Sequence, residues 1–432
     1  PDGSSNFAGK VVEIPSEAAA NQAVDLAATF RESNSSVPWA WRSQVTIHKP
    51  FDYTLGPVLH FPLREDQPIP IVHPLLAGLD LPGEATFQLW VKNWLDHEQV
   101  VTLTAEGANV DLTPSSSQLV LPAKGETSVN LRAAPAKGSG TYRFQVHLHA
   151  GPYEVKDAVV LAALREGEAI AYPLDYDRDG FDDVVLENRS VRCFISPHAG
   201  GRSFAFVRKE SNTNAFNSVG GMRDSFSTRF EPEDMKGVAE WTRVNWLGLY
   251  NRPYSFQIAS AAGVQAEVRF EYAAPDIYPK GVSLERTLTL AGDQDVVITE
   301  TALSPRGIDK PQGYVLETSV PFKSFNEANY NQWLARGRAA EDFVPPRRVD
   351  LPASNDFVGT VSKKTGETFA FMSLSSTAKS QIVVNDHSAL IRVTYPDFAA
   401  KNATYRYRAG YYFGKGTPAD VERLVAKLKA GK

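Results

Sequence analysis

The chain has 432 residues, of which 43% are hydrophobic and 22% charged, and its formal net charge is -5. A chain of this length exceeds what one core usually holds, so we expect two or three domains. The small net charge provides no field that would recruit nucleic acid or an anionic membrane. No stretch approaches the roughly 20 apolar residues of a membrane span, and no signal peptide opens the chain.

The cysteine content and the first residues bear on the compartment. The single cysteine, Cys193, excludes an internal disulfide, and its apolar alternating surroundings predict a buried thiol. The chain opens Pro1-Asp2-Gly3, which we interpret as the interior of a longer protein, after a processed leader or an upstream domain. Low cysteine with abundant Thr, Ser, Asn and aromatic residues favours a bacterial protein that is secreted, periplasmic or at the cell surface.

Residues 1–84 form the first predicted segment. Alanines and other apolar residues recur at helical spacing between Ser16 and Glu32, behind Ser16 as N-cap, so we expect a short N-terminal helix. Prolines then follow densely at Pro38, Pro50, Pro57, Pro62, Pro68, Pro70, Pro74 and Pro82. This density forbids helix and predicts an extended arm, through which the protein could associate with itself.

Residues 85–165 change to period-two alternation. Phe87, Leu89 and Val91 alternate with polar residues, and further short alternating runs follow between clusters of Gly, Pro and Ser. This rhythm predicts a sandwich of about seven strands. The phrase from Phe87 to Asn93, followed by Leu121 to Glu126, resembles the immunoglobulin-like modules that accompany bacterial glycoside-active enzymes.

Residues 166–432 form the third predicted segment, which begins near the charged link Arg165-Glu166-Gly167-Glu168. Strands dominate it. Its end has Thr417 as cap, Pro418 at the first helical position and Val421, Leu424, Val425 and Leu428 on one face. We expect a short amphipathic C-terminal helix that docks on a sheet.

Three passages of this segment resemble the galactose-mutarotase-like supersandwich of sugar epimerases, polysaccharide lyases and accessory domains of glycoside hydrolases. They are Leu186 to Phe206, Val282 to Glu300, and Ala389 to Tyr395 with Tyr405 to Phe413. The resemblance covers about residues 168–416 and implies two large stacked sheets. The predicted fold class is therefore all-β: an Ig-like sandwich followed by a supersandwich, with one short helix near each end. The mutarotases use a His and a Glu on the concave sheet, but no stretch matches their catalytic motifs, so no catalytic residue is carried over.

The strongest local motif is the run Asp175-Tyr176-Asp177-Arg178-Asp179-Gly180-Phe181-Asp182-Asp183. Alternating carboxylates, a glycine for the bend and a later acid suit a hard cation that takes oxygen ligands. Leu186 replaces the glutamate that an EF-hand would need. We therefore expect a shorter structural calcium loop, with Asp175, Asp177, Asp179 and Asp183 as ligands. The alternative is a solvated acidic turn.

A second cluster mixes aromatic rings with planar polar groups: Arg223, Asp224, Trp241, Trp246 and Tyr250. Rings stack on the apolar face of a sugar while polar groups bind its hydroxyls. We expect these residues to line a glycan-binding groove. The alternative is that Trp241 and Trp246 are ordinary core aromatics.

Acid and base candidates are Glu317 and His387 if the concave face is catalytic; otherwise they are surface or hairpin-end residues. His198 could meet a ligand at a hairpin end. His147 and His149 alternate on one strand, but no third metal ligand adjoins them. No nucleophile elbow, phosphate-binding glycine loop or His-Glu-x-x-His motif occurs.

Two functions remain open. The first is an extracytoplasmic carbohydrate-associated protein that binds or processes a glycan, as a lyase, glycoside hydrolase or epimerase if it is an enzyme. It could be the C-terminal portion of a larger glycan-active enzyme. The second is a non-catalytic structural subunit of a cell surface or filament, in which the sandwiches are building blocks.

Overall fold

The computed structural model describes residues 22–30, 39–47, 50–56, 75–176, 180–211, 213–215, 223–228, 252–274, 282–305, 314–321, 331–342, 349–351, 355–375, 379–384, 388–394 and 404–431. Contacts divide the chain into two units, which are described separately. Unit 1 comprises residues 1–58, 84–136 and 142–160, and unit 2 comprises residues 59–83, 137–141 and 161–432.

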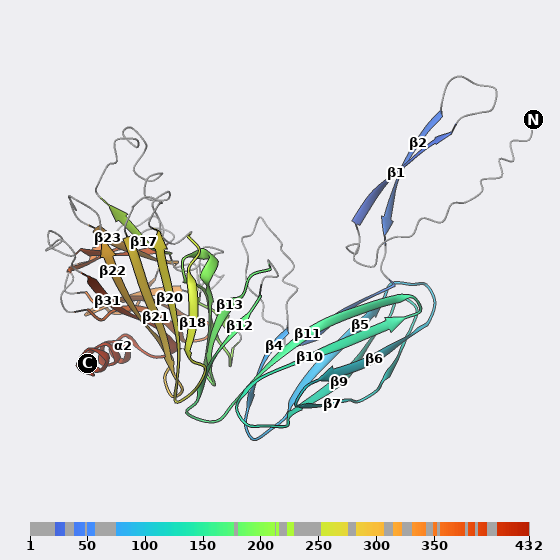
Figure 1. Ribbon diagram of the computed structural model, residues 1–432, viewed down its shortest axis with the longest axis horizontal. Coiled ribbons are helices and arrows are strands. Elements are labelled where there is room, and N and C mark those ends of the chain that lie inside the picture. Colours follow the sequence, from blue (N-terminus) through green and yellow to red (C-terminus); the bar gives the residue numbers. More distant parts are fainter. Residues whose placement is uncertain are drawn as a thin grey trace, which may run out of the picture. The chain divides into compact units, whose positions relative to one another are not determined.

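The first strand pair corrects the prediction of an N-terminal helix. Residues 22–30 form strand β1 (Gln22–Phe30), which pairs antiparallel with β2 (Trp39–Ile47) (Figure 1). Val24, Leu26, Ala28 and Phe30 occupy alternate positions of β1, so the apolar stripe has a period of two as well as a helical spacing. Pairing with β2 favours the extended conformation of residues 22–30. The last pair of this ladder places Trp39 opposite Phe30.

Two further antiparallel sheets follow. One has the order β3-β5-β9-β7, with strands β3 (Phe51–Gly56), β5 (Ala85–Asn93), β9 (Glu126–Pro135) and β7 (Val110–Pro114). The other has the order β4-β11-β10-β6-β8, with strands β4 (Leu75–Asp80), β11 (Tyr153–Leu164), β10 (Gly140–Ala150), β6 (Gln99–Gly107) and β8 (Gln118–Leu121). The two sheets stack as a sandwich, since Phe87 of β5 and Phe144 of β10 are both buried with ring centroids 5.5 Å apart. The predicted alternation is confirmed in β5, where Phe87, Leu89 and Val91 are buried.

Unit 2 contains a nine-stranded sheet, hereafter sheet G, with the order β18-β20-β21-β22-β31-β28-β27-β24-β25. Its strands are β18 (Ser255–Ser260), β20 (Gln265–Ala274), β21 (Val282–Ala291), β22 (Val296–Pro305), β31 (Tyr405–Lys415), β28 (Glu367–Ser373), β27 (Phe357–Ser362), β24 (Asn331–Ala335) and β25 (Glu341–Asp342). Strands β21 and β22 are the long hairpin expected between Val282 and Glu300.

A six-stranded sheet, hereafter sheet E, has the order β16-β15-β14-β13-β12-β19. Its strands are β16 (Thr213–Asn214), β15 (Arg202–Arg208), β14 (Val191–Ser196), β13 (Asp183–Asn188), β12 (Ala169–Leu174) and β19 (Ala262–Gly263). Sheets E and G share one apolar core, in which Phe206 of β15 packs against Phe369 and Phe413 of sheet G. Face-to-face stacking of long alternating strands is the sandwich solution expected from the sequence.

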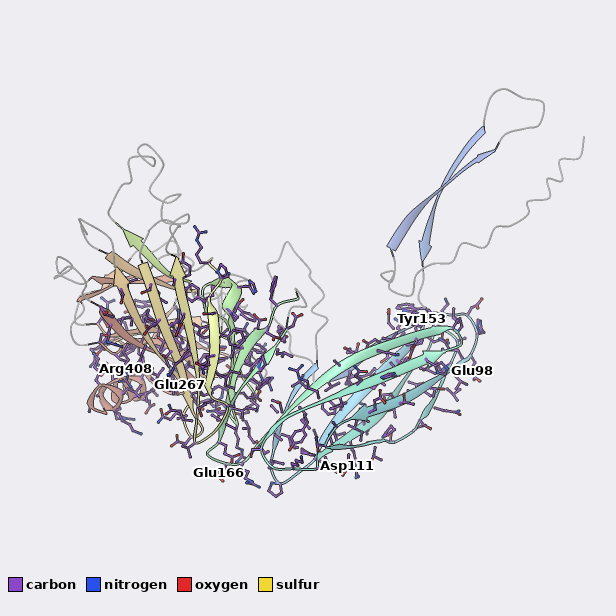
Figure 2. All side chains as sticks on the ribbon, in the orientation of Figure 1. Glu98, Asp111, Tyr153, Glu166, Glu267 and Arg408 are labelled. Carbon is purple, nitrogen blue, oxygen red and sulfur yellow. The ribbon has the colours of Figure 1, made fainter. Side chains whose placement is uncertain are left out.

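Helix α2 (Pro418–Ala430) covers the other face of sheet G. Thr417 and Asp420 form a capping box at its N-terminus, and the apolar stripe buries Val421 and Val425. Arg408 of β31 donates from Nη1 to the carbonyl oxygen of Leu428 at 2.8 Å, and Figure 2 labels this arginine beside the helix. The described part of the chain is thus an all-β sandwich fold with one C-terminal helix. No helix in that part is long and apolar enough to cross a membrane.

Candidate functional site

A five-stranded antiparallel sheet, hereafter sheet F, carries several predicted site residues. Its order is β17-β23-β30-β29-β26, with strands β17 (Arg223–Thr228), β23 (Tyr314–Pro321), β30 (Ser388–Thr394), β29 (Lys379–Val384) and β26 (Val349–Leu351). In these strands the structure describes the backbone and its register. Strands that are far apart in the chain therefore bring separate candidate residues onto one sheet.

The register places Glu317 between strands β17 and β30 of this sheet. Glu317 of β23 pairs with Ser225 of β17 on one side and with Arg392 of β30 on the other. Arg223 precedes Ser225 by two residues and pairs with Ser319. Since directly paired residues and residues two apart share one face of a sheet, Arg223, Glu317 and Arg392 all belong to the same face.

The same alternation divides the whole sheet into two chemically different faces. We call the first the polar face; it comprises Arg223, Ser225, Ser227, Val315, Glu317, Ser319, Pro321, Asp350, Lys379, Gln381, Val383, Ser388, Leu390, Arg392 and Thr394. The second face is mainly apolar; it includes Phe226, Leu316, Val320, Ile382, Val384, Ile391 and Val393. Antiparallel sheets commonly have one apolar face that packs on a core and one polar face that is open to solvent or a ligand.

Arg223 and Asp224 follow each other in β17, so the polar face contains Arg223 and the opposite face contains Asp224. Trp241, Trp246, Tyr250 and His387 lie outside the described residues. His387 falls in the three residues between the last residue of β29 and the first of β30. Arg392 was not among the predicted site residues. The signal that marks it is a charge at an alternating position within the run from Ala389 to Val393.

The predicted calcium loop connects β12 to β13, and the pair Leu174 and Asp183 closes the ladder at its base. Oδ2 of Asp175 accepts from the backbone N–H of Gly180 at 3.1 Å. Among the described residues, Oδ1 of Asp175 is buried without a hydrogen-bond partner, which fits an oxygen ligand for a cation. Asp177 and Asp179 lie outside those residues, and within the described part no group of three or more such side chains could hold a metal.

His198 lies in the short 3-10 turn Pro197–Ala199, where its ring contacts Phe181 of the acidic loop at a centroid distance of 3.7 Å. Phe181 is 51% exposed. The loop and the turn therefore meet through two aromatic rings, a contact between residues 17 positions apart that the sequence did not indicate.

His147 lies between two carboxylates on the outer face of β10. Its Nε2 is 3.5 Å from Oε1 of Glu106, and its Nδ1 is 3.7 Å from Oε1 of Glu154. These distances suit an ion pair when the imidazole is protonated. Within the described part of the chain, no group of three or more His, Cys, Asp or Glu side chains that includes His147 or His149 could hold a metal.

Two buried groups in sheet E serve the fold. Burial raises the pKa of the Cys193 thiol to about 12, so this cysteine stays protonated and unreactive, as its sequence context predicted. Burial would also raise the pKa of Glu187, but the charges of Arg192 and Lys209 outweigh it and lower this pKa to about 2. Nζ of Lys209 lies 2.6 Å from Oε1 of Glu187, and the hydroxyl of Tyr172 donates to Oε2 at 2.8 Å. Glu187 is fully buried, so this ionised cluster cannot meet a ligand.

No protein-family model matches the chain, and no curated protein matches its sequence. The solved structures that are similar in part to this chain include the following three. A proposed aldose 1-epimerase from Klebsiella pneumoniae is 10% identical with a TM-score of 0.40, over 76% of this chain and 96% of that one. A TPR-domain containing protein from Parabacteroides distasonis is 9% identical with a TM-score of 0.38, over 73% and 56%. A 4-alpha-glucanotransferase from Thermococcus litoralis is 12% identical with a TM-score of 0.35, over 57% and 39%.

The chain thus spans little more than half of the Parabacteroides protein and well under half of the glucanotransferase. At these values of identity and TM-score, the likenesses carry no argument about family or function. The case for a function has to come from the residues of this chain.

Proposed function

We propose that this chain is an extracytoplasmic, carbohydrate-associated protein that binds or processes a glycan on the polar face of sheet F. One observation carries the proposal: the register of three strands brings Arg223, Glu317 and Arg392 onto the same face. A carboxylate accepts hydrogen bonds from sugar hydroxyls, and guanidinium groups donate to the ring and hydroxyl oxygens. Serine and glutamine residues of the same face add neutral partners for hydroxyl groups.

The aromatic residues needed for stacking would come from the segment that follows β17. That strand ends at Thr228, and Trp241, Trp246 and Tyr250 come next in the chain. Rings of this kind stack on the apolar face of a pyranose. In the proposal, these residues add the apolar part of a site whose polar part is the sheet.

If the glycan is turned over, Glu317 and His387 are the acid and base candidates. Glu317 lies on β23, which pairs with β30, and His387 directly precedes β30 in the chain. Such a pair is suited to glycan cleavage by a lyase or hydrolase, or to epimerisation. We also propose that calcium binds between Asp175 and Asp183 and rigidifies the β12–β13 connection, and that unit 1 and unit 2 correspond to an Ig-like and a mutarotase-like domain.

The test is a glycan array together with intrinsic Trp fluorescence, run on the wild type, Trp246→Ala and the control Trp94→Ala. Trp94 belongs to unit 1 and stacks with Lys92, so its removal should leave glycan binding unchanged. Binding that is lost only in Trp246→Ala supports the proposal. If no glycan binds to the folded protein and sedimentation shows concentration-dependent assembly, the proposal is wrong and the structural-subunit function replaces it.

A further inference from the structure

The charges of the polar face indicate the class of glycan. Three of its positions are cationic, Arg223, Arg392 and Lys379, and two are acidic, Glu317 and Asp350. The acidic residues are not equivalent. Glu317 lies on β23, between the strands that contain Arg223 and Arg392, while Asp350 lies on β26 at the far edge of the sheet. At the spacing of neighbouring strands, β26 is about 19 Å from β17, which is four strands away.

We propose that the glycan bound by the polar face is anionic, and that Arg223 and Arg392 hold its carboxylate or sulfate group next to Glu317. This inference rests on the proposed function and deepens it. In the ladder, Arg392 of β30 lies directly opposite Glu317. Arg223 of β17 lies on the other side of Glu317, two residues from Ser225, which is directly opposite Glu317 there.

The spacing of these positions suits one charged sugar unit. Directly opposite residues are about 5 Å apart at Cβ, and diagonal neighbours are about 7–8 Å apart. Two arginines at these positions flank a central carboxylate within the span of a single saccharide. Arginine is the residue that binds carboxylate and sulfate oxygens in a bidentate manner, and each guanidinium has five donors, enough for both Glu317 and a ligand.

The composition of the face also argues against a site for neutral sugar alone. Among the described positions of the polar face there is no aromatic residue, whereas two arginines flank Glu317, Arg223 on the edge strand β17 and Arg392 on the central strand β30. A neutral sugar gains little from fixed cations, but an anionic one gains charge-assisted hydrogen bonds. The whole chain has a net charge of -5, so general attraction to polyanions would not explain binding, and a local cationic site would.

The experiment measures binding of polygalacturonate, dextran sulfate and unmodified dextran by isothermal titration calorimetry, at 50 mM and 500 mM NaCl. The proteins are the wild type, Arg392→Gln, Arg223→Gln and the control Arg269→Gln. Arg269 has a 59% exposed side chain paired with Glu267, and its strand β20 belongs to sheet G rather than sheet F. Polygalacturonate and dextran sulfate distinguish a carboxylate from a sulfate ligand. Arg223 is on the edge strand β17, so its variant stays informative if Arg392→Gln does not fold.

We expect one of the two anionic polymers to bind and to weaken in high salt. Each of Arg392→Gln and Arg223→Gln should lower the affinity about 10- to 100-fold, the effect of one charged hydrogen bond, and Arg269→Gln should not change it. Binding of dextran alone would overturn the anionic class and leave the proposed function standing. No glycan binding at all would overturn both. Unchanged affinity in both test variants would overturn the assignment to these arginines.

Discussion

Arg192 and Glu187 lie directly opposite each other on β14 and β13, and both side chains are almost fully buried. Nε of Arg192 donates to Oε2 of Glu187 at 2.9 Å, and Nη2 donates to Oε1 at 2.8 Å. With Lys209 and Tyr172 also bonded to it, the fully buried carboxylate has four donors. Loss of one partner of a buried ion pair is strongly destabilising, because the other charge is then buried without compensation. The stability of the fold therefore depends on the ionisation of Glu187.

Glu187→Gln should therefore destabilise the protein by about 3–5 kcal/mol at pH 7, because Arg192 and Lys209 would remain buried without their counter-charge. The folded pKa of about 2 lies below the ordinary value of 4.5. The stabilisation by ionised Glu187 is thus complete above about pH 4.5 and is lost as the pH falls through 4.5 toward 2. Urea unfolding of both proteins between pH 7 and pH 3 should show the difference shrinking at the acid end.

The exposed Glu98 provides the control, since Glu98→Gln should change the free energy of unfolding by less than about 0.5 kcal/mol. A difference between wild type and Glu187→Gln that stays constant down to pH 3 would mean that the effect comes from side-chain shape rather than charge.

The sequence predicted the all-β class, the sandwich alternation of β5, the β21–β22 hairpin and the C-terminal helix. It could not predict the Glu187–Arg192 pair as buried, because alternation assigns one face of each strand to solvent. In the structure all six residues of β13 and the first five of β14 are buried, so both faces are covered. Burial of a second face depends on tertiary packing, which no local pattern encodes.

The register of the paired strands is the second feature that the sequence could not predict. Glu317 was a candidate from the sequence, but its partner Arg392 is 75 residues later, and only the ladder between β23 and β30 shows that they are opposite. The helix predicted before Glu32 was wrong for a related reason. The apolar residues of β1 fit both the helical period of 3.6 and the strand period of two. Pairing with β2 selects the strand.

Helix α2 offers a test of the docking of the C-terminus. Val425 is fully buried against Leu334, Phe357 and Met372 of sheet G. Val425→Ala removes two methyl groups from this contact and should cost about 2 kcal/mol of unfolding free energy. Arg423→Ala, on the exposed side of the same helix, should cost less than about 0.5 kcal/mol. Equal effects of the two substitutions in urea titrations would contradict the observed docking face.

Gly292 should not tolerate a side chain. It forms an antiparallel bridge with Gly167, and a Cβ atom at Gly292 would meet the carbonyl oxygen of Gly167 at 2.0 Å. The atoms nearest to the added Cβ belong to the backbone of Gly167 and Glu168, so the clash can be removed only if the backbone shifts. Gly292→Ala should therefore lower the free energy of unfolding by about 3 kcal/mol. At Gly138 the nearest atom to an added Cβ is the guanidinium end of Arg165 at 3.4 Å, so Gly138→Ala is the near-neutral control. Thermal denaturation of both variants decides the matter: equal melting temperatures would exclude the close approach at Gly292.

Removal of calcium should lower the melting temperature of the wild type. At a free concentration about 100 times its Kd, a ligand stabilises the folded state by about 2.7 kcal/mol. For a unit of about 300 residues this corresponds to roughly 4 °C. Asp175→Asn should abolish most of the shift on addition of EGTA, because Oδ1 would lose its charge. An amide oxygen can still accept from Gly180 N–H, so the turn itself should survive.

Asp111→Asn, an exposed change on β7, is the control and should keep the full response to EGTA. If Asp175→Asn responds as the wild type does, calcium binds elsewhere. If the wild type itself shows no shift between calcium and EGTA, the loop between Asp175 and Asp183 is a solvated acidic turn. Isothermal titration with calcium alone distinguishes these outcomes without any glycan, so the answer is independent of what the polar face binds.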